Sequence, residues 1–226
     1  MNKGSRKLVF PTLFAILLVF IGLWIFRPNP WNHYFHKKIN DPPRDFIVKG
    51  LQNIPSPSSA EVGIDLGAGV GHETYLLLQK GYNVIAIDNQ KAAFDIMLKR
   101  PQIIPYKDRL TTYEASFENI DFQKLPSADI VIASFALPFC KPDQFNQFWH
   151  KVSHQIKPGG YFIGNTFDPG FTAFKGSARR SMTFHTKAET MNLFKDFNIL
   201  KFKEVKKPAV QKELFDHYYE VIAIKK

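Results

Sequence analysis

The sequence of 226 residues predicts an α/β fold. Short apolar runs typical of strands alternate with segments that have helical spacing. Three alternate glycines, Gly67, Gly69 and Gly71, separate the first strand-like run from a helix-forming run. Glycines between a strand and a helix N-terminus let the backbone pack closely against a nucleotide-like ligand. The sequence therefore predicts an α/β domain with a ligand site after its first strand.

Composition narrows the class of protein. A chain of this length is sufficient for one α/β domain with a sizeable core. The net charge of +10 and the pI of about 9.6 are compatible with nucleic acid, an anionic membrane surface or a generally basic cytosolic face. The basic residues are scattered and no RNA-binding signature accompanies them, which makes nucleic acid the less favoured partner. Cys140 is the single cysteine, so we expect no intramolecular disulfide, and no metal site is expected because Cys/His metal spacing is absent.

The N-terminal part predicts a membrane anchor. Residues 1–7 form a basic flank, and residues 8–26 are apolar and uncharged. A helix of that length spans about 28 Å, close to the hydrocarbon thickness of a bilayer. No small-x-small cleavage site follows, which favours a retained transmembrane helix over a cleaved signal peptide. We expect residues 27–40 to be a juxtamembrane linker and residues 41–226 to be the folded domain.

The first half of that domain is predicted from caps and periodicity. Gly81 is a natural C-cap for the helix after the glycines, and Asn89 is a candidate N-cap for the next one. Pro101 ends that second helix. The expected elements are a helix at 44–53, a strand from residue 61, a helix at 73–80, a strand at 82–88, a helix from Asn89 to about 99, and a strand at 110–114.

The second half continues the alternation. A β-branched run predicts a buried strand at 129–134, and Pro142 introduces a helix. Thr186 and Glu189 form a capping box, the pattern that starts a helix. The expected elements are the strand at 129–134, a helix at 143–156, a turn at 157–160, a strand at 161–167, a helix from Thr186 to about 195, and strands at 199–205 and 217–224.

Two acidic residues narrow the class of ligand that the glycine loop is expected to bind. Asp65 lies two residues before the first glycine, and Asp88 ends the second predicted strand. In nucleotide-binding folds an acid at that strand tip holds ribose hydroxyls. A dinucleotide fingerprint requires a glycine at position 72, which is His72 here. A nucleotide-dependent oxidoreductase is therefore the less favoured alternative.

The pattern Asp65-x-Gly67-x-Gly69-x-Gly71, with Asp88 and the Lys-Pro-Gly-Gly turn at 157–160, resembles class I S-adenosylmethionine methyltransferases. The resemblance covers about residue 40 to the C-terminus. It implies a Rossmann-like seven-stranded sheet with helices on both faces and S-adenosylmethionine as cofactor. The compact length and the C-terminal strand resemble the small-molecule branch that includes tellurite-resistance and thiopurine-type methyltransferases.

The resemblance also implies which residues bind the cofactor. The glycine loop would accommodate its methionine part and Asp88 its ribose. Ser116 stands where many members have an acid for the adenine amino group, and Glu114 and Glu118 are the acids that could replace it. The cofactor-binding candidates are Asp65, Gly67, Ala68, Gly69, Gly71, Asp88, Asn89, Ser116, Phe117 and Ser134.

The acceptor is expected beyond the fourth and fifth strands, since open α/β sheets bind ligands outside the carboxyl ends of their strands. The segment from Ser134 to Cys140 lacks the polar N-P-P-Y-type motif, which argues against a base or amide nitrogen as acceptor. Asp168 could orient a substrate, although an Asp-Pro-Gly turn explains it equally well. Arg179 and Arg180 could hold an anionic acceptor, although a solvated or membrane-facing pair is the favoured interpretation. The substrate-binding candidates are Phe135, Leu137, Asp168, Arg179 and Arg180, and no catalytic acid or base is assigned.

These observations predict a membrane-anchored methyltransferase. It would move a methyl group from S-adenosylmethionine to a small or lipid-like acceptor by in-line displacement. We expect the catalytic domain on the cytoplasmic side because S-adenosylmethionine is cytosolic. A catalytically silent cofactor-binding or membrane assembly protein is the alternative, supported by the change at Ser116. The oligomeric state stays open.

Overall fold

The computed structural model describes residues 30–58, 60–208 and 215–226. The predicted membrane helix at 8–26 lies outside these residues. Within the described part, no helix is long and apolar enough to cross a membrane.

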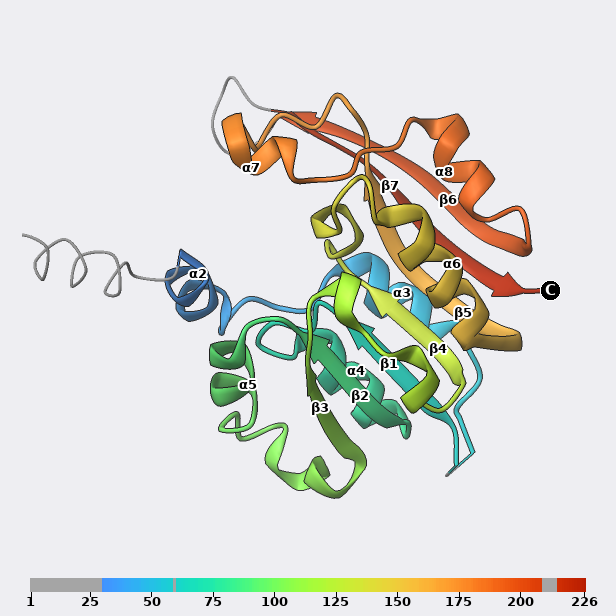
Figure 1. Cartoon of the computed structure of the whole chain (residues 1–226). Helices are drawn as coiled ribbons and strands as arrows, with labels where there is room; N and C mark the ends of the chain where they lie inside the picture. Colours follow the sequence, from blue (N-terminus) through green and yellow to red (C-terminus); the bar gives the residue numbers. More distant parts are fainter. Residues whose placement is uncertain (1–29, 59, 209–214) are drawn as a thin grey trace, which may run out of the picture.

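The core is a seven-stranded sheet in the order β3-β2-β1-β4-β5-β7-β6 (Figure 1). The first five strands are parallel, whereas β7 runs antiparallel to both β5 and β6. This arrangement confirms the predicted Rossmann-like sheet with an antiparallel pair at its end. The strands are β1 (Val62–Leu66), β2 (Asn83–Asp88), β3 (Leu110–Glu114), β4 (Ala128–Ala133), β5 (Ile156–Phe167), β6 (Phe197–Pro208) and β7 (Phe215–Lys225).

Helices cover both faces of the sheet (Figure 1). One apolar cluster packs α3 (Asp45–Gln52), α4 (His72–Lys80) and α5 (Lys91–Met97) against one face. A second cluster packs α6 (Phe145–Gln155) and α8 (Lys187–Leu193) against the other. Strands buried on both faces read as continuous apolar runs, which is why the central strands could be recognised in the sequence.

Further short helices connect these elements. They are α2 (Pro30–Lys38), α7 (Gly176–Arg180) and the 3₁₀ helices η1 (Ile104–Arg109), η2 (Phe117–Asn119), η3 (Phe122–Lys124) and η4 (Leu137–Phe139). The carboxyl ends of the five parallel strands meet at one edge of the sheet. The glycine loop and the segments that follow β2 to β5 therefore converge there.

Three expectations differ from the structure. Residues 30–38 of the expected linker form α2, because Phe35 buries its ring against the domain and Pro30 suits a first helical turn. Asn89 does not cap α5: the helix begins at Lys91, and the Asn89 side chain instead accepts a hydrogen bond from Gln90 Nε2. The Lys-Pro-Gly-Gly segment belongs to the amino end of β5, since Ile156 already pairs with Ala128.

Candidate cofactor and acceptor site

The loop after β1 requires glycine for conformation and for space. Gly67, Gly69 and Gly71 have φ angles of 71°, 51° and 82°, in the left-handed region that favours glycine. A Cβ at Gly67 would lie 2.7 Å from Ala136 Cβ, and one at Gly71 would lie 2.6 Å from Met97 Cγ. The backbone N–H groups of Gly67 and Ala68 both donate to the Ile87 carbonyl, at 2.8 and 3.0 Å. The loop is thus fixed against the end of β2.

Asp88 joins the end of β2 directly to this loop. Its Oδ2 accepts from Gly69 N–H at 2.9 Å, and its Oδ1 accepts from Gln90 N–H at 2.9 Å. Burial raises the pKa of Asp88, and the backbone hydrogen bonds oppose that rise. The carboxylate has about four lone pairs and accepts from the backbone of Gly69, Gln90 and Asn89, so it keeps capacity for a further donor such as a ribose hydroxyl.

Asp65 connects the strand before the glycine loop to the helix after it. It is 1 % exposed, and its Oδ2 accepts from Thr74 Oγ1 on α4 at 2.6 Å. Burial raises the pKa of Asp65 to about 8, and the neighbouring carboxylates of Glu73 and Asp88 add to the rise. The geometry makes Asp65 a link between β1 and the start of α4.

The loop after β3 brings Ser116 together with Glu118. Burial alone would raise the pKa of Glu118, but hydrogen bonds from its own and the Lys141 backbone N–H and from the Ser116 hydroxyl lower it. Glu118 Oε1 lies 3.3 Å from Lys141 N and thereby connects this loop to the one after β4. Glu114 instead ends β3 and pairs with Asp88 in the register. Of the two acids considered for the adenine side, Glu118 is the one beside Ser116.

Aromatic side chains form the edge of the site beyond β4 and β5. Phe135, which follows Ser134 after β4, has a φ of 54°, and its ring lies 5.5 Å from that of Phe167 and 5.0 Å from that of Tyr218. Its N–H donates to Asn165 Oδ1 at 2.6 Å. The aromatic rim comprises Phe135, Phe139, Phe167, Phe171, Phe174, Met182, Phe184, Val205 and Tyr218.

Sequence reasoning did not single out Asn165. The available signal was a polar residue within an otherwise apolar predicted strand. Such a residue is costly to bury without a partner.

Three of the proposed acceptor residues are engaged elsewhere. Leu137 is fully buried in the core below α6, because η4 turns its side chain inward. The Asp168 carboxylate accepts from Gly170 N–H at 2.7 Å and from Tyr219 OH at 2.5 Å, and it contacts His217 Nδ1 at 2.8 Å. Arg179 donates to the carbonyls of Phe171 and Pro169 and lies over the Phe184 ring. Asp168 and Arg179 therefore hold the loop after β5, while Arg180 is exposed.

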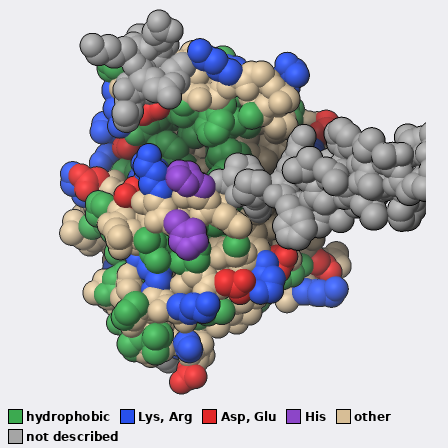
Figure 2. All heavy atoms as spheres, turned by 90° about the vertical axis from the view of Figure 1, so that its left-hand side faces the viewer, with side chains coloured by type: hydrophobic (Ala, Val, Ile, Leu, Met, Phe, Trp, Pro, Cys, Tyr) green, Lys and Arg blue, Asp and Glu red, His purple; other side chains and the backbone are tan. Residues whose placement is uncertain are grey.

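Helix α2 covers the glycine loop. Phe35 is 3 % exposed and packs with Val70 and Ala93, and the Trp31 ring lies 5.5 Å from that of Phe139. His72 Nε2 donates to the carbonyl of Lys38 at 2.8 Å, which ties the end of α2 to the start of α4. Figure 2 views the side of the molecule on which α2 lies, where histidines gather beside hydrophobic side chains. The i, i+4 spacing of Trp31 and Phe35 was the signal for this helix.

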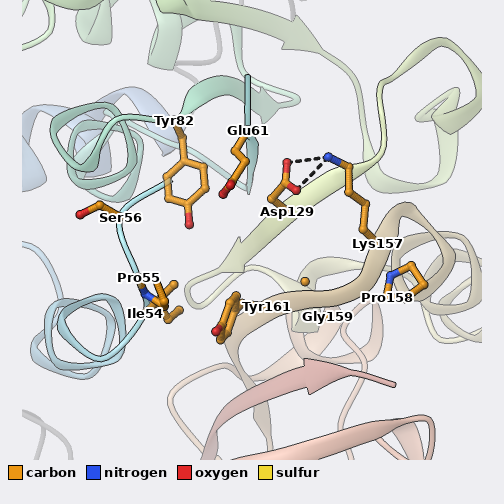
Figure 3. Close-up of a pocket in the computed structure, with 11 residues that line it drawn as sticks. Ile54, Pro55, Ser56, Glu61, Tyr82, Asp129, Lys157, Pro158, Gly159 and Tyr161 are labelled. Atoms are coloured by element: carbon orange, nitrogen blue, oxygen red, sulfur yellow. Dashed lines mark hydrogen bonds and ion pairs between the residues drawn. The ribbon is translucent and has the colours of Figure 1, made fainter. Parts of the chain in front are cut away.

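Two pockets lie apart from the glycine loop. One, of about 270 Å³, is at the amino ends of the strands (Figure 3). There Lys157 Nζ lies 2.8 Å from both oxygens of Asp129, whose Oδ2 also accepts from Val62 N–H. The charges of Lys157 and Asp129 in this pocket thus pair with each other. The other pocket, of about 540 Å³, lies between α2 and α5.

Comparison with known proteins agrees with this geometry. The family model of a methyltransferase domain matches residues 64–160, which include the glycine loop, Asp88 and the segment after β4. Residues 64–160 thus resemble the domain of class I S-adenosylmethionine-dependent methyltransferases. S-adenosylmethionine is accordingly its cofactor.

Curated relatives match part of the chain. Carboxy-S-adenosyl-L-methionine synthase of Vibrio vulnificus (strain YJ016) is 27% identical over 109 residues, 48% of this chain and 43% of that protein. Cypemycin N-terminal methyltransferase of a Streptomyces species is 26% identical over 131 residues, 57% of this chain and 51% of that protein. The chain thus spans about half the length of the curated relatives it matches.

Solved structures share the fold over more of the chain. TehB from Haemophilus influenzae superimposes with a TM-score of 0.69 at 16% identity, over 87% of this chain and 67% of that chain. The N-methyltransferase NodS from Bradyrhizobium japonicum WM9, in complex with S-adenosyl-L-homocysteine, gives 0.64 at 11% identity, over 87% and 99%. The 1,6-didemethyltoxoflavin-N1-methyltransferase of Burkholderia thailandensis gives 0.56 at 18% identity, over 99% and 93%.

The residues of this chain fit the cofactor. The left-handed glycines leave the loop without side chains where the methionine part would lie, and Asp88 keeps lone pairs for the ribose. Ser116, Phe117 and Glu118 follow β3, where the adenine would lie. Ser134 directly follows β4 at the same edge of the sheet.

Proposed function

We propose that this protein transfers the methyl group of S-adenosylmethionine to a small-molecule acceptor. The observation that carries the proposal is the hydrogen bond between the Asp88 carboxylate and Gly69 N–H, within a loop of three left-handed glycines. It joins the ribose-binding acid to the loop for the methionine part in one rigid unit. The match to a methyltransferase domain supports the same reaction.

The protein would act mainly by positioning. The bound cofactor supplies an activated methyl group, so the chain has to orient the acceptor in line with it and exclude water. The glycine loop and Asp88 fix the cofactor side. The aromatic rim around Phe135, Phe167 and Tyr218 supplies an apolar wall on the acceptor side. Phe35 and Trp31 of α2 shield the glycine loop from solvent.

The acceptor side favours a substrate that needs no base. Within the described residues of the loop after β5, Asp168 and Arg179 are already held by neighbouring groups. A soft or anionic acceptor reacts without proton removal, whereas a hydroxyl or ammonium acceptor requires a base. The structure of 1,6-didemethyltoxoflavin-N1-methyltransferase, which holds 1,6-didemethyltoxoflavin, supports a small acceptor.

We also propose a membrane location with the catalytic domain on the cytoplasmic side. The apolar, uncharged run at 8–26 and the cytosolic occurrence of the cofactor support it. A lipid-soluble acceptor would then be a natural substrate. Activity of a reporter fused to the C-terminus only on the outer side of the membrane would refute this orientation.

Turnover tests the proposed reaction. The full chain would be incubated with S-adenosylmethionine and chalcogen oxyanions, thiols, small amines or quinols, and S-adenosylhomocysteine would be quantified. We expect acceptor-dependent product formation with at least one class. Cofactor binding without turnover on any of them would instead support a silent cofactor-binding protein, the reading that the change at Ser116 favours.

A further inference from the structure

Asn165 in β5 carries an unsatisfied hydrogen-bond donor at the acceptor side. Its side chain is fully buried, and its Nδ2 is the one buried side-chain polar atom of the described residues that has no hydrogen-bond partner. The orientation of the amide is fixed, because Phe135 N–H needs an acceptor and Asn165 Oδ1 provides it at 2.6 Å. The Nδ2 group therefore cannot exchange places with Oδ1 without leaving a second donor unpaired.

The neighbours in the sheet do not satisfy this donor. Glu220, the residue opposite Asn165 on β7, is buried, and its Oε2 lies 3.8 Å from Lys203 Nζ on β6. Buried polar groups in folded proteins nearly always have partners, and those without one call for an explanation such as a ligand. Leaving a buried donor unpaired carries a cost to stability, which a bound acceptor atom would remove.

The backbone beside Asn165 is strained as well. Phe135 is the one non-glycine residue of the described chain with a positive φ, at 54°. A bulky residue in that region is a genuine outlier, and such strain clusters at ligand sites. The segment that carries Phe135 also borders the cofactor side, since the next residue, Ala136, packs against Gly67.

A cation lies over the same ring. The guanidinium carbon of Arg44, at the N-cap of α3, is 4.2 Å from the centre of the Phe135 ring. Arg44 is exposed and forms no salt bridge with the residues that the structure describes. The Asn165 amide is thus hydrogen-bonded to the Phe135 backbone, and the Arg44 guanidinium lies over the Phe135 ring. The apolar rings of Phe167 and Tyr218 lie beside that ring.

We propose that Asn165 Nδ2 donates a hydrogen bond to the methyl acceptor and that Arg44 supplies a positive charge near it. The acceptor would have an apolar, ring-like body that carries a carbonyl or carboxylate oxygen. Asn165 is in this account a substrate-binding and specificity residue. The inference rests on the proposed methyltransferase function and names the substrate class of that site.

Calorimetry with three related probes tests the inference. Benzoate, benzamide and benzylamine share one ring and differ in the polar group. With saturating S-adenosylhomocysteine, we expect benzoate and benzamide to bind the wild-type chain and benzylamine, which offers a cation, to bind at least about tenfold more weakly. In Asn165→Asp the carboxylate still accepts from Phe135 N–H but replaces the Nδ2 donor. We expect that variant to lose benzoate affinity by about tenfold or more.

Arg44 provides an independent arm on the surface. Arg44→Gln should weaken benzoate several-fold and change benzamide little, because only benzoate is charged. Lys49→Gln, an exposed change of the same charge on the same helix, is the matched control and should leave both unchanged. If thermal unfolding shows that the Asn165→Asp variant is not folded, the comparison of Arg44→Gln with Lys49→Gln decides the question.

No binding of benzoate to the wild type, or equal binding by the wild type and both variants, would overturn the inference. If S-adenosylhomocysteine itself does not bind, the proposed function fails. The probe titrations are then repeated without it, so that the Asn165 site is judged separately.

Discussion

Phe35 Cε1 lies 3.9 Å from the position that a Cβ on Gly69 would occupy, so a residue of α2 covers the loop that faces the cofactor. The ring is nearly buried and also packs with Val70 and Ala93. Residues before the sheet thus complete the site that β1 and β2 begin.

Removing this ring should weaken cofactor binding. In Phe35→Ala we expect the affinity for S-adenosylhomocysteine to fall by about tenfold, because water reaches the loop and α2 loses its main anchor. Calorimetry on the full chain measures the effect. Tyr34→Ala, at a more exposed position of the same helix, is the control and should change affinity little. Equal or tighter binding by Phe35→Ala would show that α2 plays no part in the site.

Glu118 should contribute to binding on the adenine side. Its carboxylate holds Ser116 and the loop after β4 in place. We expect Glu118→Gln to lower the affinity for S-adenosylhomocysteine several-fold, by roughly 1 kcal/mol, because an amide accepts these hydrogen bonds less strongly than a carboxylate. Glu114→Gln, at the exposed end of β3, should have little effect. The reverse order in titrations of the two variants would assign the role to Glu114.

Asp65 should make stability depend on pH. Its pKa in the folded state is about 8, above the ordinary value of 3.8, so the folded protein binds more protons than the unfolded chain between those values. The contribution of the protonated group is fully present below about pH 4 and is lost as the pH rises toward 8.

The Asp65→Asn variant isolates that contribution. The amide oxygen still accepts from Thr74, and the group no longer titrates. We expect the Tm of the variant, relative to wild type, to rise as the pH is increased from 5 to 8. A difference in Tm that is constant over this range would mean that Asp65 is ionised in the folded protein throughout.

Gly71 should tolerate alanine less well than Gly159. Both have positive φ angles, 82° and 80°, so alanine is strained at either position. A Cβ at Gly71 also lies 2.6 Å from Met97 Cγ, whereas at Gly159 no atom lies within 4 Å. We expect Gly159→Ala to cost about 1 kcal/mol of unfolding free energy and Gly71→Ala about 1–3 kcal/mol more. Denaturant unfolding of the two variants measures the difference, and equal costs would show that Met97 yields freely.

The sheet and the cofactor loop were predictable because their signals are local. The apolar runs of β1, β2 and β4, the alternate glycines and the capping box at Thr186 each act within a few residues. Asp65 and Asp88, acidic residues near the ends of predicted strands, could likewise be recognised from the sequence. These features owe little to distant contacts.

The missed features depend on contacts between distant segments. Phe35 forms part of a helix because it packs on Val70 and Ala93, which a linker composition does not reveal. The positive φ of Phe135 is coupled to Asn165, 30 residues away. Leu137 points into the core rather than toward an acceptor, because η4 turns it inward, and local spacing does not specify that turn.

Calorimetric titration of the full chain with S-adenosylmethionine, S-adenosylhomocysteine and NAD tests the central claim most directly. We expect the first two to bind competitively at one site and NAD not to bind. Asp88→Ala should abolish that binding while the protein stays folded, and Asp95→Ala, an exposed change of the same kind on α5, should not. Absence of binding by both sulfur nucleotides to the folded wild-type chain would contradict the account.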